Sequence, residues 1–196
     1  MSTRIPAAPT GSATVDPFIW TDDAAALIDF LVAVFGAVEV PEARTADSDG
    51  LVLHSELLIG DSTLTIADRK PGWPYTPAFV RVYVDDPEAV LSRAEERGGR
   101  IVTTPTDFFG DVLSRFADPF GHLWWVYKHN PGAAVWDEPT GQSADEGSDE
   151  GTDWAPGEDA SADSGQSWES VTSPELEYIH SSLIEAMTRL RDPRAE

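Results

Sequence analysis

Two stretches of the chain space their apolar residues as amphipathic helices do. In the first, apolar positions recur at i, i+3, i+4, i+7 and i+8, with Thr21 or Asp22 as the expected N-cap and Gly36 as the stop. In the second, Asp86 can cap the helix and Pro87 fits its first position. The inward-facing residues are Leu27, Phe30, Leu31, Val34 and Phe35 in the first stretch and Val90, Leu91 and Ala94 in the second. The pattern therefore predicts two helices.

Strand signals surround both helices in the same order. One strand precedes each helix, and three follow it. The expected following strands are 38–40, 51–59 and 63–67 after the first helix, and 100–103, 112–116 and 123–127 after the second. A shift of 63 positions superposes 21–23 on 84–86 and Gly36 on Gly99. The chain thus predicts an α+β fold of two tandem βαβββ units.

Composition divides the 196 residues into four parts. These are a flexible leader at 1–14, a folded domain at 15–130, a disordered acidic linker at 131–172 and an amphipathic helix at 173–191. The last helix has Ser173 as its N-cap. Its apolar stripe is Leu176, Ile179, Leu183, Met187 and Leu190. Such a stripe docks on its own domain or on a dimer partner, or it recruits another protein.

The net charge of the chain limits the kinds of molecule that it can be expected to bind. The net charge is −22, and residues 131–196 alone carry sixteen acidic side chains and three arginines. Such a chain repels phosphate backbones, so nucleic-acid binding is not expected, whereas a cationic ligand would be attracted. The lack of cysteine excludes disulfides and thiolate sites. Because no apolar run could span a membrane and the start has no targeting pattern, a cytoplasmic location is expected.

A turn-and-strand motif near the end of the folded domain carries a family likeness. It reads Asp118-Pro119-Phe120-Gly121-His122-Leu123-Trp124-Trp125. Together with 20–36, 54–66, 82–99 and 110–126, it resembles the vicinal-oxygen-chelate superfamily, which includes glyoxalases, bleomycin-resistance proteins and dioxygenases. The resemblance implies that the strands curl into a mixed-sheet cleft, which a homodimer usually completes.

The same resemblance implies where a divalent metal would be bound. The ligand positions correspond to Asp16, Leu64, Phe79 (or Ala78, if the register is shifted by one) and Trp125. Only Asp16 can donate an oxygen, and one carboxylate does not make a transition-metal site. The chain therefore resembles a metal-free, glyoxalase-like branch of the superfamily, and neither a metal nor another cofactor is expected.

Alternation along the strands predicts an aromatic surface in place of that metal. If positions 16, 79 and 125 face the cleft, residues two positions away face it as well. The predicted ligand-binding residues are Phe18, Trp20, Trp73, Phe79, Arg81, Tyr83, Trp125 and Tyr127. Aromatic walls with few polar groups suit a flat organic ligand. The competing interpretation is that several of these rings are ordinary core residues.

Four polar residues are the candidates for catalysis, namely Asp16, His54, Glu56 and Arg115. His54 and Glu56 lie two positions apart and so share one face of a strand. They can meet one ion there, or they simply form the exposed polar face of a sheet.

Three functions follow from these patterns. The favoured one is a binding protein of the glyoxalase/bleomycin-resistance type, which sequesters an aromatic or cationic small molecule without a metal, as in antibiotic resistance. The alternative is a lyase, isomerase or oxygenase with an atypical divalent-metal or acid/base site. The third is a dimeric interaction platform whose acidic tail recruits a protein partner.

Overall fold

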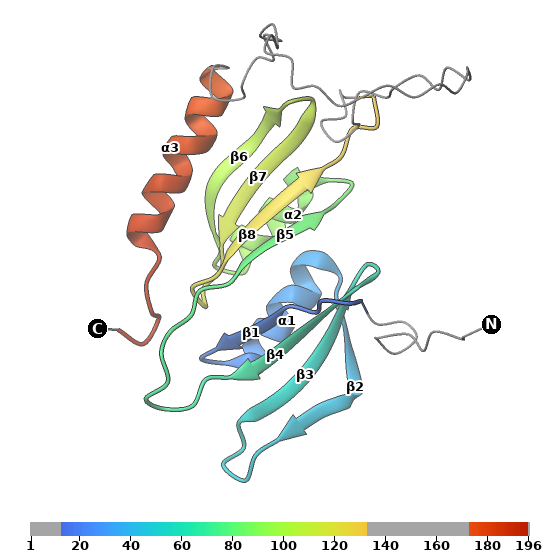
Figure 1. Ribbon diagram of the computed structural model, residues 1–196, viewed down its shortest axis with the longest axis vertical. Coiled ribbons are helices and arrows are strands. Elements are labelled where there is room, and N and C mark those ends of the chain that lie inside the picture. The colour runs from blue at the N-terminus through green and yellow to red at the C-terminus, as the bar shows by residue number, and fades with distance from the viewer. Residues whose placement is uncertain (1–12, 133–172, 196) are drawn as a thin grey trace, which may run out of the picture.

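The computed structural model describes residues 13–132 and 173–195 (Figure 1). The predicted leader lies outside the described residues except at 13–14, and so does the predicted acidic linker except at 131–132. Within the described part the chain forms eight strands and three helices. The expected C-terminal helix is α3, Pro174–Arg189. None of these three helices combines the length and the apolar character that a membrane crossing requires.

Each repeat unit forms a mixed sheet with one helix. The first contains β1 (Phe18–Thr21), α1 (Ala24–Phe35), β2 (Val38–Ala46), β3 (Val52–Ile59) and β4 (Ser62–Asp68). The second contains β5 (Phe79–Tyr83), α2 (Pro87–Glu96), β6 (Arg100–Phe108), β7 (Asp111–Ala117) and β8 (Leu123–Lys128). The sheet orders are β1-β4-β3-β2 and β5-β8-β7-β6, with the first pair of each parallel and the others antiparallel. The predicted fold of two tandem βαβββ units is confirmed.

Two strands run further than the sequence pattern predicts. β2 continues to Ala46 and β6 to Phe108, and the pairing of each strand shifts register along its length. Pro41 and Pro105 lie within the shifted stretches. Because a proline has no N–H to donate and interrupts the alternation, the pattern hides the second half of each strand.

The N-cap of α1 is Asp23, and the prediction of Thr21 or Asp22 is wrong. The Asp23 carboxylate accepts a hydrogen bond of 2.9 Å from the amide of Ala26. Asp22 is instead paired with Arg69 at 2.5 Å. Since all three residue types suit a cap, the tertiary ion pair decides which one is used. The other predicted boundaries, the glycine stop of α1 and the aspartate cap of α2, are confirmed.

Both helices contribute to one core that the two sheets share. Its buried members include Ile19, Leu27, Leu31, Val34, Leu57, Ile66, Leu91, Phe116, Trp124 and Val126. The ring of Phe35 in α1 lies 5.3 Å from that of Trp124 in β8, so the first helix contacts the second sheet. Alternation turns every second strand residue away from this core. We call the side of each sheet turned away from α1 and α2 its outer face.

One buried carboxylate holds the turn before β8. Asp118 accepts hydrogen bonds from the amides of Phe120 and His122, each at 2.9 Å. The indole Nε1 of Trp124 donates a third, at 2.8 Å. Burial raises the pKa of Asp118, while these donors oppose the rise. His122 accepts the Ala78 amide at 3.0 Å through Nδ1, which ties the turn to the residue before β5.

We expect Asp118→Ala to lower the free energy of unfolding by about 3 kcal/mol, because three donors in the turn lose their acceptor. Chemical denaturation followed by far-ultraviolet circular dichroism measures the change. The control is Asp61→Ala, since Asp61 lies exposed between β3 and β4 and its replacement should cost less than about 0.5 kcal/mol. Equal effects of the two substitutions would contradict the role given to Asp118.

Candidate functional site

The outer face of the second sheet carries Trp125 between two arginines. Trp125 of β8 pairs in register with Arg81 of β5 on one side and with Arg115 of β7 on the other. Thr103 of β6 extends the row beyond Arg115. Because residues opposite each other on neighbouring strands share a face, one indole and two guanidinium groups form a single row across the sheet.

Further aromatic rings border this row. The ring centres of Phe79 and Trp125 are 5.8 Å apart, and those of Tyr83 and Tyr127 are 5.7 Å apart. The guanidinium carbon of Arg81 lies 5.5 Å from the centre of each tyrosine ring. Phe79 is 48% and Tyr83 56% exposed, whereas Trp125 is partly buried and Tyr127 is buried. The accessible part of this aromatic surface therefore lies along β5.

Arg115 is a buried cation, with only 4% of its surface exposed. Its guanidinium carbon lies 5.1 Å from the ring centre of Trp125. Nη1 donates to the carbonyl of Ile179 at 2.8 Å and to the hydroxyl of Thr103 at 3.2 Å. Nε is buried without a hydrogen-bond partner in the described part of the chain. Burial lowers the pKa of Arg115, but the group stays protonated because a guanidinium titrates far above neutral pH.

The C-terminal helix α3 docks on this same sheet, along β6 (Figure 1). The hydroxyls of Ser182 and Thr103 lie 2.8 Å apart, and the Tyr178 hydroxyl accepts the Thr104 amide at 3.0 Å. Ile179 packs with two residues of the outer face, Leu113 and Tyr127. The helix therefore covers the part of the outer face that β6 and β7 provide, and it leaves Phe79 and Tyr83 exposed.

The docked side of α3 agrees in part with the apolar stripe expected from the sequence, since Ile179 is buried and Leu176, Leu183 and Leu190 are partly buried. Met187 belongs to that stripe and is 47% exposed, whereas Ser182 and Ala186 are buried. The physical reason is the character of β6, where Thr103 and Thr104 offer polar groups to the helix. Small and polar residues of α3 therefore turn toward the sheet.

Ion pairs bind the residues after α3 to the first repeat unit. Arg69 is 3% exposed and bridges Asp22 at 2.5 Å and Asp192 at 2.6 Å. Arg194 contacts the same Asp22 at 2.9 Å. The hydrogen bonds from Arg69 lower the pKa of Asp192 to about 2. The tail is thus attached to the second unit through α3 and to the first unit through these charges.

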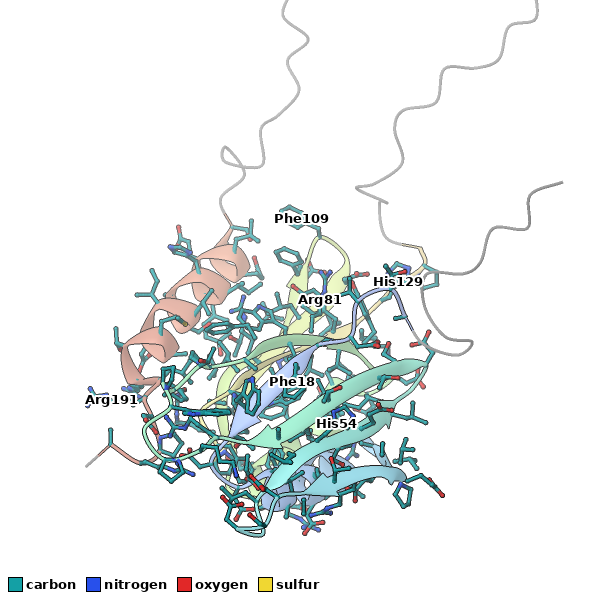
Figure 2. All side chains as sticks on the ribbon, turned by 60° about the horizontal axis from the view of Figure 1, so that its bottom comes forward. Phe18, His54, Arg81, Phe109, His129 and Arg191 are labelled. Atoms are coloured by element: carbon teal, nitrogen blue, oxygen red, sulfur yellow. The ribbon has the colours of Figure 1, made fainter. Side chains whose placement is uncertain are left out.

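The outer face of the first sheet carries a separate aromatic group. Phe18 and Trp20 of β1 stack with ring centres 4.8 Å apart, and Trp73 meets Trp20 edge-on at 4.9 Å. The ring of His54 lies 6.3 Å from that of Phe18 (Figure 2). His54 Nε2 is 3.1 Å from Glu56 Oε1, so these two residues share a face as predicted. No ring contact between described residues joins this group to the rings of the second sheet.

The four candidates for catalysis, all within the described part, are not brought together. His54 and Glu56 contact each other on the first sheet. Asp16 precedes β1 and is exposed. Arg115 is buried on the second sheet beside α3. The arrangement therefore offers no common point at which an acid, a base and an anion-holding cation could act on one substrate.

The positions that would hold a metal offer few donor atoms. Leu64 is 4% exposed and packs in the core, while Phe79 and Trp125 present rings. Among the described residues, no group of three or more histidine, aspartate or glutamate side chains could hold a metal ion. Asp16 would be a single donor, and this donor set does not fit a divalent transition metal.

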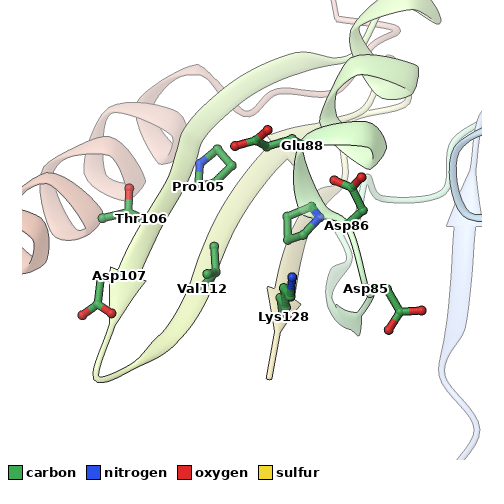
Figure 3. A pocket seen from close by; sticks show the side chains of 9 residues that line it. Asp85, Asp86, Glu88, Pro105, Thr106, Asp107, Val112 and Lys128 are labelled. Carbon is green, nitrogen blue, oxygen red and sulfur yellow. The ribbon is translucent and has the colours of Figure 1, made fainter. Parts of the chain in front are cut away.

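A hollow of about 560 Å³ opens near the start of α2, away from these rings (Figure 3). Asp85, Asp86, Glu88 and Asp107 place four carboxylates around it, and Lys128 places one ammonium group. No described residue that lines it is aromatic. Since a flat ligand needs apolar walls, the aromatic surface around Trp125 is the stronger candidate site.

Sequence reasoning missed the residues that join α3 to the sheet. The bonds of Ser182 and Tyr178 reach partners 79 and 74 positions away, and such pairs leave no periodic pattern. One signal was available. Arg115 alternates with Leu113 and Ala117 on one strand face, and a cation on an apolar face needs a partner or a cover.

Two tandem βαβββ units with an aromatic outer face define a protein of the vicinal-oxygen-chelate class. Residues 13–126 match the model of the Glyoxalase/Bleomycin resistance protein/Dioxygenase superfamily. An uncharacterised protein of Mycobacterium bovis is 34% identical over 122 residues, which cover 56% of this chain and 79% of the relative. One of Mycobacterium tuberculosis is 34% identical over 122 residues, with 56% and 71% covered. The chain belongs to this superfamily.

Solved structures with a similar fold include two from bacteria. TioX from Micromonospora sp. ML1 is 25% identical, with 59% of this chain and 99% of TioX covered and a TM-score of 0.47. The fosfomycin resistance protein FosX from Listeria monocytogenes is 14% identical, with 61% and 95% covered and a TM-score of 0.47.

We expect α3 to detach in acid. The pKa of paired Asp192 is about 2, below its ordinary value of 3.8. Its ion pair therefore stabilises docking above about pH 4, and this contribution is lost as the pH falls through about 2. Hydrogen-exchange protection factors of α3 amides, compared between about pH 5 and about pH 2, measure the change. Protection that stays constant over this range would contradict the tail attachment.

At neutral pH, Asp192→Asn should lower the protection factors of α3 by at least about tenfold, because a hydrogen bond to a charged group is worth about 1.5–3 kcal/mol. Glu185→Gln is the matched control. It removes an exposed ion pair with Arg189 on the same helix, and such pairs contribute little. A loss of protection as large in the control as in Asp192→Asn would show that the effect does not come from the tail.

Proposed function

We propose that the protein binds an aromatic small molecule in an aromatic-lined cleft on the outer face and sequesters it without a metal. The observation that carries the proposal is the position of Trp125. This indole stands where the family resemblance expects a metal-binding glutamate, and it is partly exposed in a row with Arg81 and Arg115. A planar ring is the chemistry that such a surface accepts best.

The rings around Trp125 can contribute enough free energy to bind a planar ligand with micromolar affinity. Phe79 and Tyr83 are accessible on the neighbouring strand, and their contacts with Trp125 and Tyr127 hold the surface in shape. Each aromatic contact is worth about 0.5–1.5 kcal/mol beyond the burial of its area. A micromolar complex requires about 8 kcal/mol, so several stacked rings together with apolar burial are of the right order.

We include Phe18, Trp20 and Trp73 among the proposed ligand-binding residues, as a second aromatic surface. Phe18 and Trp73 are 46% and 47% exposed on the first sheet. Exposed rings on both sheets also support the proposed homodimer, in which a second copy would cover part of this apolar area. A cytoplasmic location is part of the proposal as well.

The enzymatic alternative has less support. A lyase, isomerase or oxygenase of this superfamily would need a metal donor set, or an acid/base pair beside an anion-holding cation. His54 and Glu56 form a pair on the first sheet, but Arg115 lies on the second sheet, and the described residues contain no group of three donors. Metal analysis of protein purified without chelator separates the two functions. A stoichiometric divalent ion would favour the enzyme, and a thermal-shift screen against metals and antibiotics would then name the ligand class.

We expect Trp125→Ala to weaken binding of the neutral dye N-phenyl-1-naphthylamine about tenfold, because one stacking contact of about 1.4 kcal/mol is lost. Fluorescence titration gives the dissociation constant, and thermal unfolding shows whether the variant stays folded. Trp20→Ala reports on the first sheet in the same assay.

The control for this experiment is Trp154→Ala. Trp154 lies in the predicted linker, outside the described residues, and its replacement should leave the affinity unchanged. Equal losses in Trp125→Ala and Trp154→Ala would place the ligand elsewhere. If the wild-type protein bound neither this dye nor any planar compound of the screen, the proposal would fail.

A further inference from the structure

The two arginines beside Trp125 have no acidic partners. Neither Arg81 nor Arg115 forms an ion pair with a described residue, whereas Arg44, Arg69 and Arg194 each do. The chain contains 35 aspartates and glutamates against 13 lysines and arginines, so acidic side chains are plentiful. Other described cations also lack an ion pair, among them Arg97 and Arg100. Arg81 and Arg115 differ from these because they stand in one row on either side of Trp125.

The strand segments around Arg81, Arg115 and Trp125 are free of acids. Segments 79–83, 113–117 and 123–127 contain no aspartate or glutamate. The next acids after β5, Asp85 and Asp86, line the hollow of Figure 3. The charged groups that stack on these rings, Arg81 and Arg115, are thus positive. At physiological salt, charges beyond about 8 Å are largely screened, so the local arginines outweigh the net charge.

Arg81 can bind a ligand in addition to its contacts with the two tyrosines. It is exposed, and its guanidinium lies over the rings of Tyr83 and Tyr127 at 5.5 Å. Arg81 also hydrogen-bonds the side chain of Tyr127. A guanidinium has five N–H groups, so stacking and this one bond still leave N–H groups for a ligand. Such N–H groups bind carboxylates, sulfonates and phosphates in proteins, often through two hydrogen bonds.

Arg115 adds a second positive charge from beneath Trp125. It is buried, its Nε has no described partner, and its two hydrogen bonds both come from Nη1. A buried cation without a counter-ion is costly, and a negative group near it lowers that cost. Both arginines would therefore favour an anion bound beside Trp125. Arg81 would contact it directly, and the buried Arg115 would attract it at longer range.

We propose that this surface takes a planar aromatic ligand that carries an anionic group. The ring lies against Trp125 and Phe79, and the anionic group, a carboxylate, sulfonate or phosphate, is bound by Arg81. This inference rests on the proposed function of binding an aromatic molecule around Trp125, and it names the charge of that molecule. It is opposite in sign to the cationic ligand that the net charge alone favours.

Two dyes with the same rings test the proposal. 1-Anilinonaphthalene-8-sulfonate has the ring system of N-phenyl-1-naphthylamine and one additional sulfonate. We expect the full-length protein to bind the sulfonate dye at least about tenfold more tightly than the neutral dye, as charge-assisted hydrogen bonds do. Arg81→Gln should abolish this advantage, so that the ratio of the two dissociation constants falls to about one whatever the change in affinity for the neutral dye. Thermal unfolding establishes that the variant is folded.

Arg97→Gln is the matched control, since Arg97 is an exposed arginine at the end of α2 without an ion pair to a described residue. It should keep the full advantage of the sulfonate dye. Equal affinities of wild-type protein for the two dyes, or tighter binding of the cationic planar dye proflavine, would overturn the anionic assignment and leave the proposed function standing. An equal loss in Arg97→Gln and Arg81→Gln would also overturn it. Binding of none of the three dyes would instead count against the proposed function itself.

Discussion

Two adjacent tryptophans of β8 must point to opposite sides of the sheet, because a strand turns successive side chains to opposite faces. Trp124 enters the shared core, where Asp118 accepts its indole N–H, and Trp125 reaches the outer face between two arginines. A slip of one residue would exchange the two indoles. The three hydrogen bonds of Asp118 fix the strand against such a slip. The stability of the core and the geometry of the site therefore depend on the same turn.

The outer face of the second sheet has two parts. One is the proposed ligand surface, and the other is covered by the C-terminal helix α3. β5 leaves Phe79 and Tyr83 accessible, whereas α3 packs along β6 and reaches Arg115. Arg115 touches both parts, since its guanidinium stacks on Trp125 and its Nη1 donates to α3. A change in the position of the helix would therefore alter the support of the indole. The proposed site and the tail are physically coupled through this one side chain.

Local sequence patterns were sufficient to predict the fold and the face on which Trp125 lies. The helix stripes, the repeat and the alternation that places Trp124 inside and Trp125 outside could all be predicted, because each depends on neighbours within a few residues. Long-range pairing could not be predicted. Asp22 and Asp23 are equally good caps, and only the contact of Asp22 with Arg69 decides between them. Ser182 is likewise buried because it bonds the hydroxyl of Thr103, which lies 79 positions away in the sequence.

The bond between Arg115 and α3 is made to the main-chain carbonyl of Ile179, not to a side chain. Every amino acid supplies that carbonyl, so substitution at position 179 does not remove the acceptor as long as the backbone stays helical. Tails of quite different sequence can therefore keep this anchor. A sequence comparison between relatives would show such tails as divergent even where they dock in the same way. Only the strand arginine, Arg115 in this chain, would indicate that the contact is present.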